Sequence, residues 1–149
     1  IRDREVIVAP IENSLNGKLV CDMAIGGIGP LKRPVNLRVQ NGEVKDATSE
    51  DVQVLKRVKE ALSTDGWSKI VGEFAFGINP KARFVREFLE SEKILGTIHI
   101  AFGNNSDMPG GKNKSKNHMD FLISNPNVKV FNKDGSSFDV LVDGVFQLF

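Results

Sequence analysis

The sequence predicts an α+β fold in which about eight short strands form a mixed, largely antiparallel sheet accompanied by two helices. The strand-like segments follow one another through turn signals such as Gln40-Asn41-Gly42-Glu43, as they do in hairpins. Residues 35–39 alternate between apolar and polar side chains, which is the period of a half-buried strand. Helical spacing of apolar residues is confined to two segments, and there is no internal repeat or heptad pattern.

The strands are expected as short stretches separated by Gly, Pro, Asn and Asp residues. The first, residues 5–9, has the pattern of a short buried strand stopped by Pro10. The glycine-rich residues 26–30 are interpreted as a flexible connection and not as a phosphate-binding loop, because no helix start follows them. The other strands are expected at residues 18–24, 35–39, from 44 onward, 71–77, 97–102, 119–124, 128–131 and 138–142.

Two helices are expected between these strands. The first covers roughly residues 50–63, with Ser49 as its N-cap and acidic residues in the first turn, where the helix dipole favours them. The second is expected over residues 82–89, after Asn79-Pro80. The apolar residues of the first helix recur at helical spacing and are Val52, Leu55, Val58 and Leu62.

The composition limits the classes of partner. The chain has 149 residues, the size of one domain, and its 20 Lys and Arg residues stand against 19 Asp and Glu residues. This balance gives no reason to expect nucleic acid or an acidic membrane as a partner. No stretch approaches the roughly 18 apolar residues that would span a bilayer, and no signal peptide is visible.

The single cysteine, Cys21, excludes an internal disulfide framework. It lies in the apolar run Leu19-Val20-Cys21, and we expect a buried, inert thiol there, not a metal ligand or nucleophile. A reducing, cytoplasmic location is therefore favoured. Because the chain opens with Ile1 instead of Met, we also expect it to be part of a longer protein.

Both histidines of the chain are candidates for metal binding. His118 and Asp120 form an H-x-D pair, and on a strand such residues point to the same face, where they could converge on one ion. A His–Asp hydrogen bond or an exposed strand face would also explain this pair. His99 lies in an otherwise apolar strand. The loop at residues 110–116 holds three lysines, which are either a solvated tip or a site for an anionic substrate group.

Two carboxylates lie inside apolar strands. Glu73 is surrounded by the apolar residues of 71–77, and a buried carboxylate needs a partner, since leaving it unpaired costs several kcal/mol. The partner is either a metal ion or an arginine. Glu5 has the same character, although Arg2 and Arg4 beside it make an ion pair the simpler explanation there.

Five stretches together resemble one family: EVIVAP at residues 5–10, GEFAFGINP at 72–80, EKILGTIHIAFG at 92–103, GG at 110–111 and HMD at 118–120. Their order and approximate spacing are similar to those of the thermophilic metalloprotease, or aminopeptidase T, family over nearly the whole chain. The resemblance implies a leucyl-type aminopeptidase with two divalent ions (zinc, cobalt or manganese) and a metal-activated water that attacks the peptide carbonyl. By motif, it implies the metal ligands Glu5, Glu73, His99, His118 and Asp120.

The resemblance also implies that residues 1–149 are a single metal-binding catalytic domain, the C-terminal part of a longer two-domain protein. The peptidases of that family have a tyrosine shortly after the first histidine, whereas this chain has none and carries Asn104-Asn105-Ser106-Asp107 there. A related branch, the 2,5-dihydroxypyridine dioxygenases, resembles this family in its scaffold. In that branch, His99, His118 and Asp120 would form the facial triad of an Fe(II) site.

Three hypotheses follow from the resemblance. The first is a metal-dependent aminopeptidase-like hydrolase in which Glu73 is a ligand or the general base. The second is a mononuclear Fe(II) ring-cleaving dioxygenase, and the third is a degenerate domain without turnover. The presence of both Glu5 and Glu73 favours the hydrolase, because one Fe(II) triad needs neither. A peptide or small-molecule substrate is expected, and a homodimer is left open.

Overall fold

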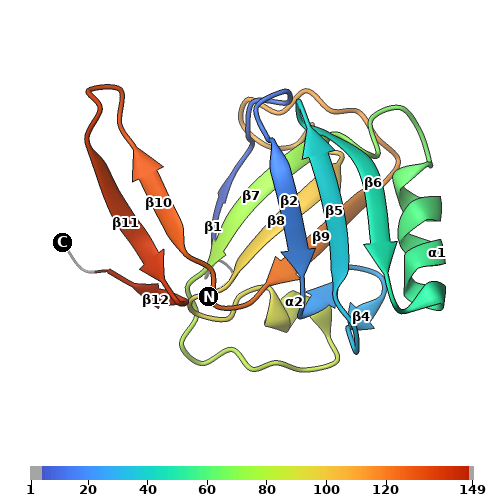
Figure 1. Ribbon diagram of the computed structural model, residues 1–149, viewed down its shortest axis with the longest axis horizontal. Coiled ribbons are helices and arrows are strands. Elements are labelled where there is room, and N and C mark those ends of the chain that lie inside the picture. Colours follow the sequence, from blue (N-terminus) through green and yellow to red (C-terminus); the bar gives the residue numbers. More distant parts are fainter. Residues whose placement is uncertain (1–4, 148–149) are drawn as a thin grey trace.

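The computed structural model describes residues 5–147, which form three sheets and two helices (Figure 1). The predicted α+β class and the largely antiparallel pairing are confirmed. Twelve strands are present in these residues, where the sequence predicts about eight in one sheet. Part of the excess consists of two-residue strands, which are too short to leave a pattern in the sequence.

The six-stranded sheet has the order β1-β7-β8-β9-β3-β4. Its strands are β1 (Glu5–Val8), β7 (Val71–Gly77), β8 (Ile98–Gly103), β9 (His118–Ile123), β3 (Ala24–Ile25) and β4 (Gly29–Pro30). The predicted strand at residues 18–24 is divided, because β2 (Gly17–Cys21) pairs in a second sheet while β3 pairs with β9. The division lies at Asp22, whose carboxylate accepts hydrogen bonds from the backbone and the hydroxyl of Ser124.

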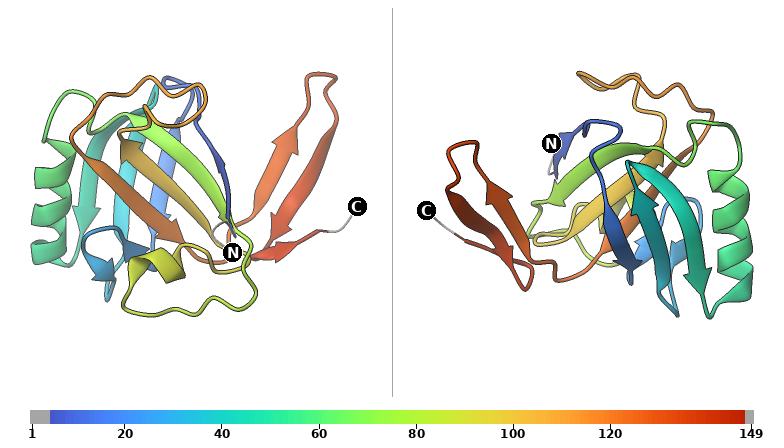
Figure 2. Two further views of the ribbon diagram at one scale, coloured as in Figure 1. Left: turned by 180° about the vertical axis from the view of Figure 1, so that it is seen from behind. Right: turned by 45° about the horizontal axis from the view of Figure 1, so that its top comes forward.

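The second sheet, β2-β5-β6, packs over one face of the first, and α1 lies along β6 (Figures 1 and 2). Its other strands are β5 (Val35–Gln40) and β6 (Glu43–Ser49), and the helix is α1 (Val52–Leu62). The predicted hairpin turn is confirmed, since Asn41 and Gly42 have φ angles of 50° and 76°, as a type I′ turn requires. A Cβ at Gly42 would also collide with the carbonyl of Glu12.

The hydrophobic core lies between these two sheets and α1. Phe102 of β8 and Phe121 of β9 are fully buried in it, with their ring centroids 5.8 Å apart in an edge-to-face arrangement. The other buried members are Cys21, Ile25, Val35, Leu37, Val39, Val44, Ala47, Val58, Leu62, Val71, Ile100 and Met119.

Cys21 has the buried thiol that the sequence predicts. Its Sγ lies 3.2 Å from the carbonyl oxygen of Ala24 and 3.1 Å from that of Leu122. Burial raises the pKa of this thiol to about 12, so that it is not a nucleophile at neutral pH.

The first helix begins later than the sequence predicts. Its N-cap is Asp51, whose carboxylate accepts a hydrogen bond from the Val54 backbone at 3.1 Å. Ser49, the predicted cap, is the last residue of β6, and its hydroxyl donates to the Pro34 carbonyl instead.

The prediction of a second helix over residues 82–89 is wrong, because α2 covers only Phe88–Ser91. The Ser91 hydroxyl accepts a hydrogen bond from the Val85 backbone at 3.2 Å and donates one to its carbonyl at 2.9 Å. The Ser91 side chain thus satisfies the backbone N–H and C=O of Val85, which a longer helix would pair with its own backbone. Within the described residues, no helix is long and apolar enough to cross a membrane.

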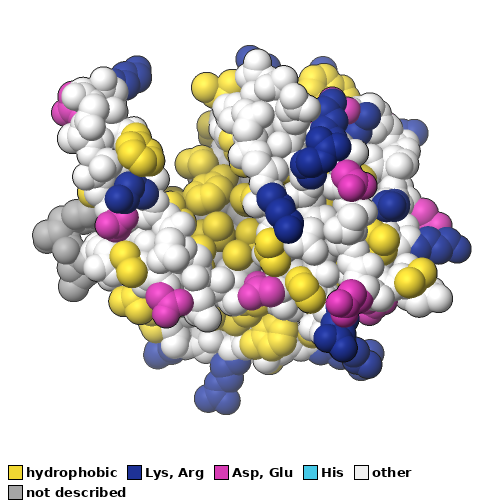
Figure 3. Space-filling model, in the orientation of Figure 1, with side chains coloured by type: hydrophobic (Ala, Val, Ile, Leu, Met, Phe, Trp, Pro, Cys, Tyr) yellow, Lys and Arg dark blue, Asp and Glu magenta, His cyan; other side chains and the backbone are white. Residues whose placement is uncertain are grey.

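The prediction that the first strand is buried is also wrong. β1 is an edge strand that pairs only with β7, and the side chains of Val6, Ile7 and Val8 are 50%, 43% and 53% exposed. Hydrophobic side chains gather in the hollow of Figure 3 where β1 and β7 lie in Figure 1. An apolar run alone cannot distinguish an edge strand from a central one, since the difference depends on which other strands arrive beside it.

The third sheet is an arm that stands away from the two-sheet body (Figures 1 and 2). It consists of β10 (Val128–Phe131), β11 (Ser137–Val142) and β12 (Val145–Phe146), so that the last two predicted strands form a separate hairpin. The ring of Phe146 reaches back to Phe76 of β7, at 6.1 Å between centroids.

We expect Phe102→Ala to lower the free energy of unfolding by about 3–5 kcal/mol, because it removes a fully buried ring and leaves a cavity. Chemical denaturation followed by circular dichroism measures this change. Phe131→Ala on the arm is the matched control, since that side chain is 74% exposed and its loss should change stability by no more than about 0.5 kcal/mol. Equal losses in both variants would contradict the location of the core between the sheets.

Candidate metal centre

Three neighbouring strands bring candidate ligands to one face of the six-stranded sheet. Ala101 of β8 pairs with Glu73 of β7 on one side and with Asp120 of β9 on the other. Paired residues in antiparallel strands share a face, and so does His99, two residues before Ala101. The small Ala101 side chain leaves space between the two carboxylates. The opposite face of the same strands carries the core phenylalanines.

The carboxylate of Glu73 lies between the two imidazoles. Its Oε1 is 2.9 Å from His99 Nε2, and its Oε2 is 3.3 Å from His118 Nε2. Asp120 Oδ1 is close to the same two ring nitrogens, at 3.2 Å from His118 and 3.9 Å from His99. The H-x-D pair therefore does form a His–Asp contact, and the same contact places both residues beside Glu73. The partners of Glu73 are imidazoles, where the sequence left open a metal ion or an arginine.

Burial differs across this cluster. Glu73 and His99 are 4% and 1% exposed, whereas the His118 side chain is 33% exposed. The cluster is therefore closed to solvent at Glu73 and His99 and accessible to solvent at His118.

The electrostatics of the cluster favour an ionised Glu73 carboxylate and protonated imidazoles. Burial raises the pKa of Glu73, but hydrogen bonds from His118 and His99 lower it further, to about 2. Hydrogen bonds to Asp120 and Glu73 raise the pKa of His118 to about 11. Burial lowers the pKa of His99, yet the hydrogen bond to Glu73 and the charge of Asp120 raise it overall.

Glu5 joins the cluster from β1. Its Oε2 lies 4.0 Å from His99 Nε2, and its Oε1 forms an ion pair with Lys93 at 3.1 Å. The neighbouring arginines that suggested an ion pair at Glu5 lie outside the described residues, so the ion pair is present but its described partner is Lys93. All five predicted ligands thus have a carboxylate or imidazole atom within 4.0 Å of another member.

The sequence analysis missed Glu92 and Lys93, which follow α2. Glu92 is buried, its Oε1 lies 3.0 Å from Lys93 Nζ, and burial raises its pKa. Glu92 joins Glu5 and His99 in a second group of close candidate ligands. Both residues begin the family-like stretch EKILGTIHIAFG, but an acidic residue beside a lysine is also typical of an ordinary surface ion pair.

The loop between β8 and β9 fixes the orientation of His118. The ring Nδ1 of His118 lies 2.7 Å from the Asn104 carbonyl oxygen, which directs Nε2 toward the carboxylates. The loop is held by two buried amides, since Asn105 donates to the Gly72 carbonyl at 2.9 Å and Asn113 donates to that of Val71 at 2.9 Å. Buried asparagines in a polar loop were not anticipated from the sequence. The lysines of this loop are exposed, as expected of a solvated tip.

The residues of the cluster fit a divalent cation. Imidazole nitrogens and carboxylate oxygens are the donors that zinc, manganese, cobalt and iron use in proteins. The ligand atoms of Glu73, His99 and Asp120 lie within 4.8 Å of one another. Two buried atoms of the region, Glu5 Oε2 and His99 Nδ1, have no hydrogen-bond partner, and Glu5 Oε2 would be satisfied by a cation.

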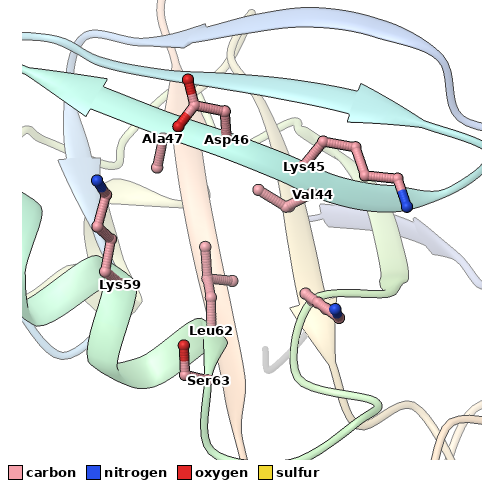
Figure 4. A pocket seen from close by; sticks show the side chains of 8 residues that line it. Val44, Lys45, Asp46, Ala47, Lys59, Leu62 and Ser63 are labelled. Atoms are coloured by element: carbon pink, nitrogen blue, oxygen red, sulfur yellow. The ribbon is translucent and has the colours of Figure 1, made fainter.

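A cavity of about 510 Å³ lies along β1, and none of the five predicted ligands is in its lining. Its Ile7 pairs with Ala75, which in turn pairs with His99, so that Ile7 lies on the face of the cluster. The full lining is Ile7, Val8, Ala9, Asp107, Met108 and Pro109. The cavity of about 250 Å³ in Figure 4 lies elsewhere, between α1 and β6, and is lined by none of the five predicted ligands.

A family model described as thermophilic metalloprotease (M29) matches residues 1–146, which confirms the resemblance seen in the motifs. A comparison with curated proteins gave no match.

Two solved structures share the fold. Wild-type AmpT from Thermus thermophilus superposes with a TM-score of 0.80 and 23% identity over 97% of this chain and 40% of that chain. A 2,5-dihydroxypyridine dioxygenase from Pseudomonas putida KT2440 superposes with a TM-score of 0.77 and 19% identity over 95% of this chain and 42% of that chain. This chain therefore spans about two fifths of the length of either structure.

We expect Glu73→Gln to lower the pKa of both histidines in the metal-free chain, because it removes the negative charge that stabilises the protonated rings. The chain has two histidines, so titration of the ring signals by NMR follows each of them separately. Asp134→Asn in the exposed turn of the arm should leave both pKa values unchanged. An unaltered His118 titration in the Glu73 variant would contradict the bridging role of Glu73.

Proposed function

The chain belongs to the thermophilic metalloprotease (M29) family, and from this we propose that it is a metal-dependent hydrolase of the aminopeptidase type. The observation that carries the proposal is the convergence of both imidazoles on the buried Glu73 carboxylate, with Asp120 beside them. Glu73, His99, His118 and Asp120 would hold a divalent ion, zinc, cobalt or manganese, with Glu5 completing the set. We take residues 1–149 as one metal-binding catalytic domain.

A divalent ion bound here would polarise a peptide carbonyl and lower the pKa of a bound water. The role of the protein residues would be to hold that ion in place. The sequence left Glu73 as a ligand or as the general base. The ligand atoms of Glu73, His99 and Asp120 lie within 4.8 Å of one another, a spacing that favours the ligand role for Glu73.

The absence of tyrosine limits the chemistry of the remaining residues. In this chain no phenol can stabilise an oxyanion, so donors of another kind must do so. The loop that replaces the family tyrosine region contributes the Asn104 carbonyl to His118, which is a positioning contact.

The cavity along β1 supports an apolar N-terminal residue in the substrate, as in the leucyl type. Ile7, Met108 and Pro109 give it apolar walls, and Ile7 lies on the same face of the sheet as the cluster. The carboxylate of Asp107 lies in the same lining and could pair with the free amino group of a peptide. A peptide or small molecule is thus the proposed partner, without nucleic acid or a membrane, and a homodimer stays open.

A second candidate is a mononuclear Fe(II) ring-cleaving dioxygenase of the 2,5-dihydroxypyridine type. It is favoured by the likeness in fold to the Pseudomonas putida enzyme together with the absence of tyrosine. His99, His118 and Asp120 would supply the triad. A domain without turnover is the remaining alternative. The buried free thiol of Cys21 supports a reducing, cytoplasmic location in each case.

Glu73→Gln distinguishes the two enzymes. In the hydrolase, we expect it to lower cleavage of leucyl anilides by about 10²–10⁴-fold or more, since a base or a ligand is lost. In the dioxygenase, the triad remains and Fe(II)-dependent oxygen uptake with dihydroxypyridines should persist.

The assay uses protein loaded with zinc, manganese or anaerobic Fe(II), and Glu60→Gln on the exposed face of α1 is the control. The hydrolase proposal would be overturned by oxygen uptake with Fe(II), the absence of anilide cleavage, and a Glu73→Gln variant with unchanged oxygen uptake. No turnover under any condition would favour the degenerate domain.

Zinc binding is expected to release protons at pH 7. The raised pKa of His118, about 11, keeps the ring protonated in the metal-free chain, and an imidazole must be neutral to bind a metal. Zinc affinity should therefore rise with pH through the range from neutrality toward that value. Calorimetric titration in two buffers of different ionisation enthalpy counts the released protons. Binding without proton release would contradict His118 as a ligand.

A further inference from the structure

Lys93 holds a position between two buried carboxylates. Its Nζ lies 3.1 Å from Glu5 Oε1 and 3.0 Å from Glu92 Oε1. The side chains of Lys93, Glu5 and Glu92 are only 24%, 12% and 10% exposed. The backbone of Lys93 is fixed as well, since its carbonyl accepts a hydrogen bond from the Asn79 backbone at 2.8 Å. This is a structured ion pair and not a surface contact.

The Lys93 ammonium contacts the carboxylates that a second metal ion would need as ligands. Glu5, Glu92 and His99 offer ligand atoms within 4.8 Å of one another, a spacing that could hold a cation. Lys93 contacts an oxygen of both carboxylates in that group. A divalent cation among the same three residues would meet the ammonium at close range, and two positive charges at such a distance in a partly buried site repel strongly.

The contact of Lys93 with Glu5 Oε1 leaves Glu5 Oε2 free to bind a metal ion. Glu5 Oε2 is buried, has no hydrogen-bond partner, and lies 4.0 Å from His99 Nε2. Lys93 binds Oε1 and thereby turns Oε2 toward the group formed by Glu73, His99 and Asp120.

We propose that the Lys93 ammonium takes the place of a second cation, so that the chain holds one divalent ion tightly and Glu5 Oε2 is presented to that ion. Lys93 is in this sense a positioning residue that sets metal stoichiometry. The proposal rests on the proposed metal-dependent function and departs from the two ions that the family resemblance implies.

The test is metal stoichiometry, measured without reference to activity. The chain and its variants are titrated with Mn²⁺ by calorimetry, and the ions retained after dialysis are counted by elemental analysis. Electron paramagnetic resonance then distinguishes single Mn²⁺ ions from a coupled pair. The variants are Lys93→Met, which removes the charge, and Lys93→Arg, which keeps it. Lys69→Met is the matched control, because Lys69 pairs at 2.7 Å with Glu43, which is not one of the candidate ligands.

We expect one tight ion in the wild type, in Lys93→Arg and in Lys69→Met. Lys93→Met should bind a second ion at least about tenfold more tightly than the wild type does and should show the coupled-pair spectrum. Its metal-free form should melt at a lower temperature, since two buried carboxylates lose their partner, and added Mn²⁺ should restore more of this loss than it gives the wild type.

Two tight ions in the wild type would overturn the proposal while leaving the metal-dependent function intact. A single ion in a folded Lys93→Met would overturn it too. If Lys93→Met does not fold, Lys93→Gln removes the charge and keeps a hydrogen-bond donor, and one ion there has the same meaning. Absence of any bound ion in the wild type would reject the proposed function itself, and this inference with it.

Discussion

A carboxylate inside a protein stays ionised only where positive charge or hydrogen-bond donors compensate for lost water, and Glu73 meets this need with both histidines of the chain. Each oxygen of Glu73 faces one imidazole, and Asp120 shares the second. The same contacts lower the pKa of Glu73 and raise that of His118, so that the metal-free cluster is a compact arrangement of opposite charges. A divalent cation that displaced the ring protons would use the same atoms.

Antiparallel register is what makes this arrangement possible. Ala101 pairs with Glu73 and Asp120 at once, so one small residue on the central strand spaces two carboxylates across three strands. Because side chains alternate along each strand, Phe102 and Phe121 fill the core from the opposite face. Strands β7, β8 and β9, which carry four of the five candidate ligands, are therefore also strands that build the core, and packing positions these four ligands.

The candidate activities differ in how many of the clustered carboxylates they use. One Fe(II) triad uses His99, His118 and Asp120, and it gives no role to Glu5 or Glu92. A hydrolase centre can use additional carboxylates, yet their negative charge must be balanced when the region is buried. Lys93 supplies part of that balance from the chain itself. The position of this one lysine thus bears on how many ions the family scaffold holds in this protein.

The sequence by itself determined the α+β class, the hairpin at Asn41-Gly42 and the buried thiol, since turn chemistry, period-two alternation and apolar runs are local signals. The set of five candidate ligands came from the family resemblance of several motifs taken together, and it stays a prediction. Only the tertiary structure decided that β1 is an exposed edge, that the chain divides at Asp22 between two sheets, and that residues 82–87 are not helical. These depend on which segments meet in space. The contact of Lys93 with Glu5 joins residues 88 positions apart, and no local pattern encodes such a pair.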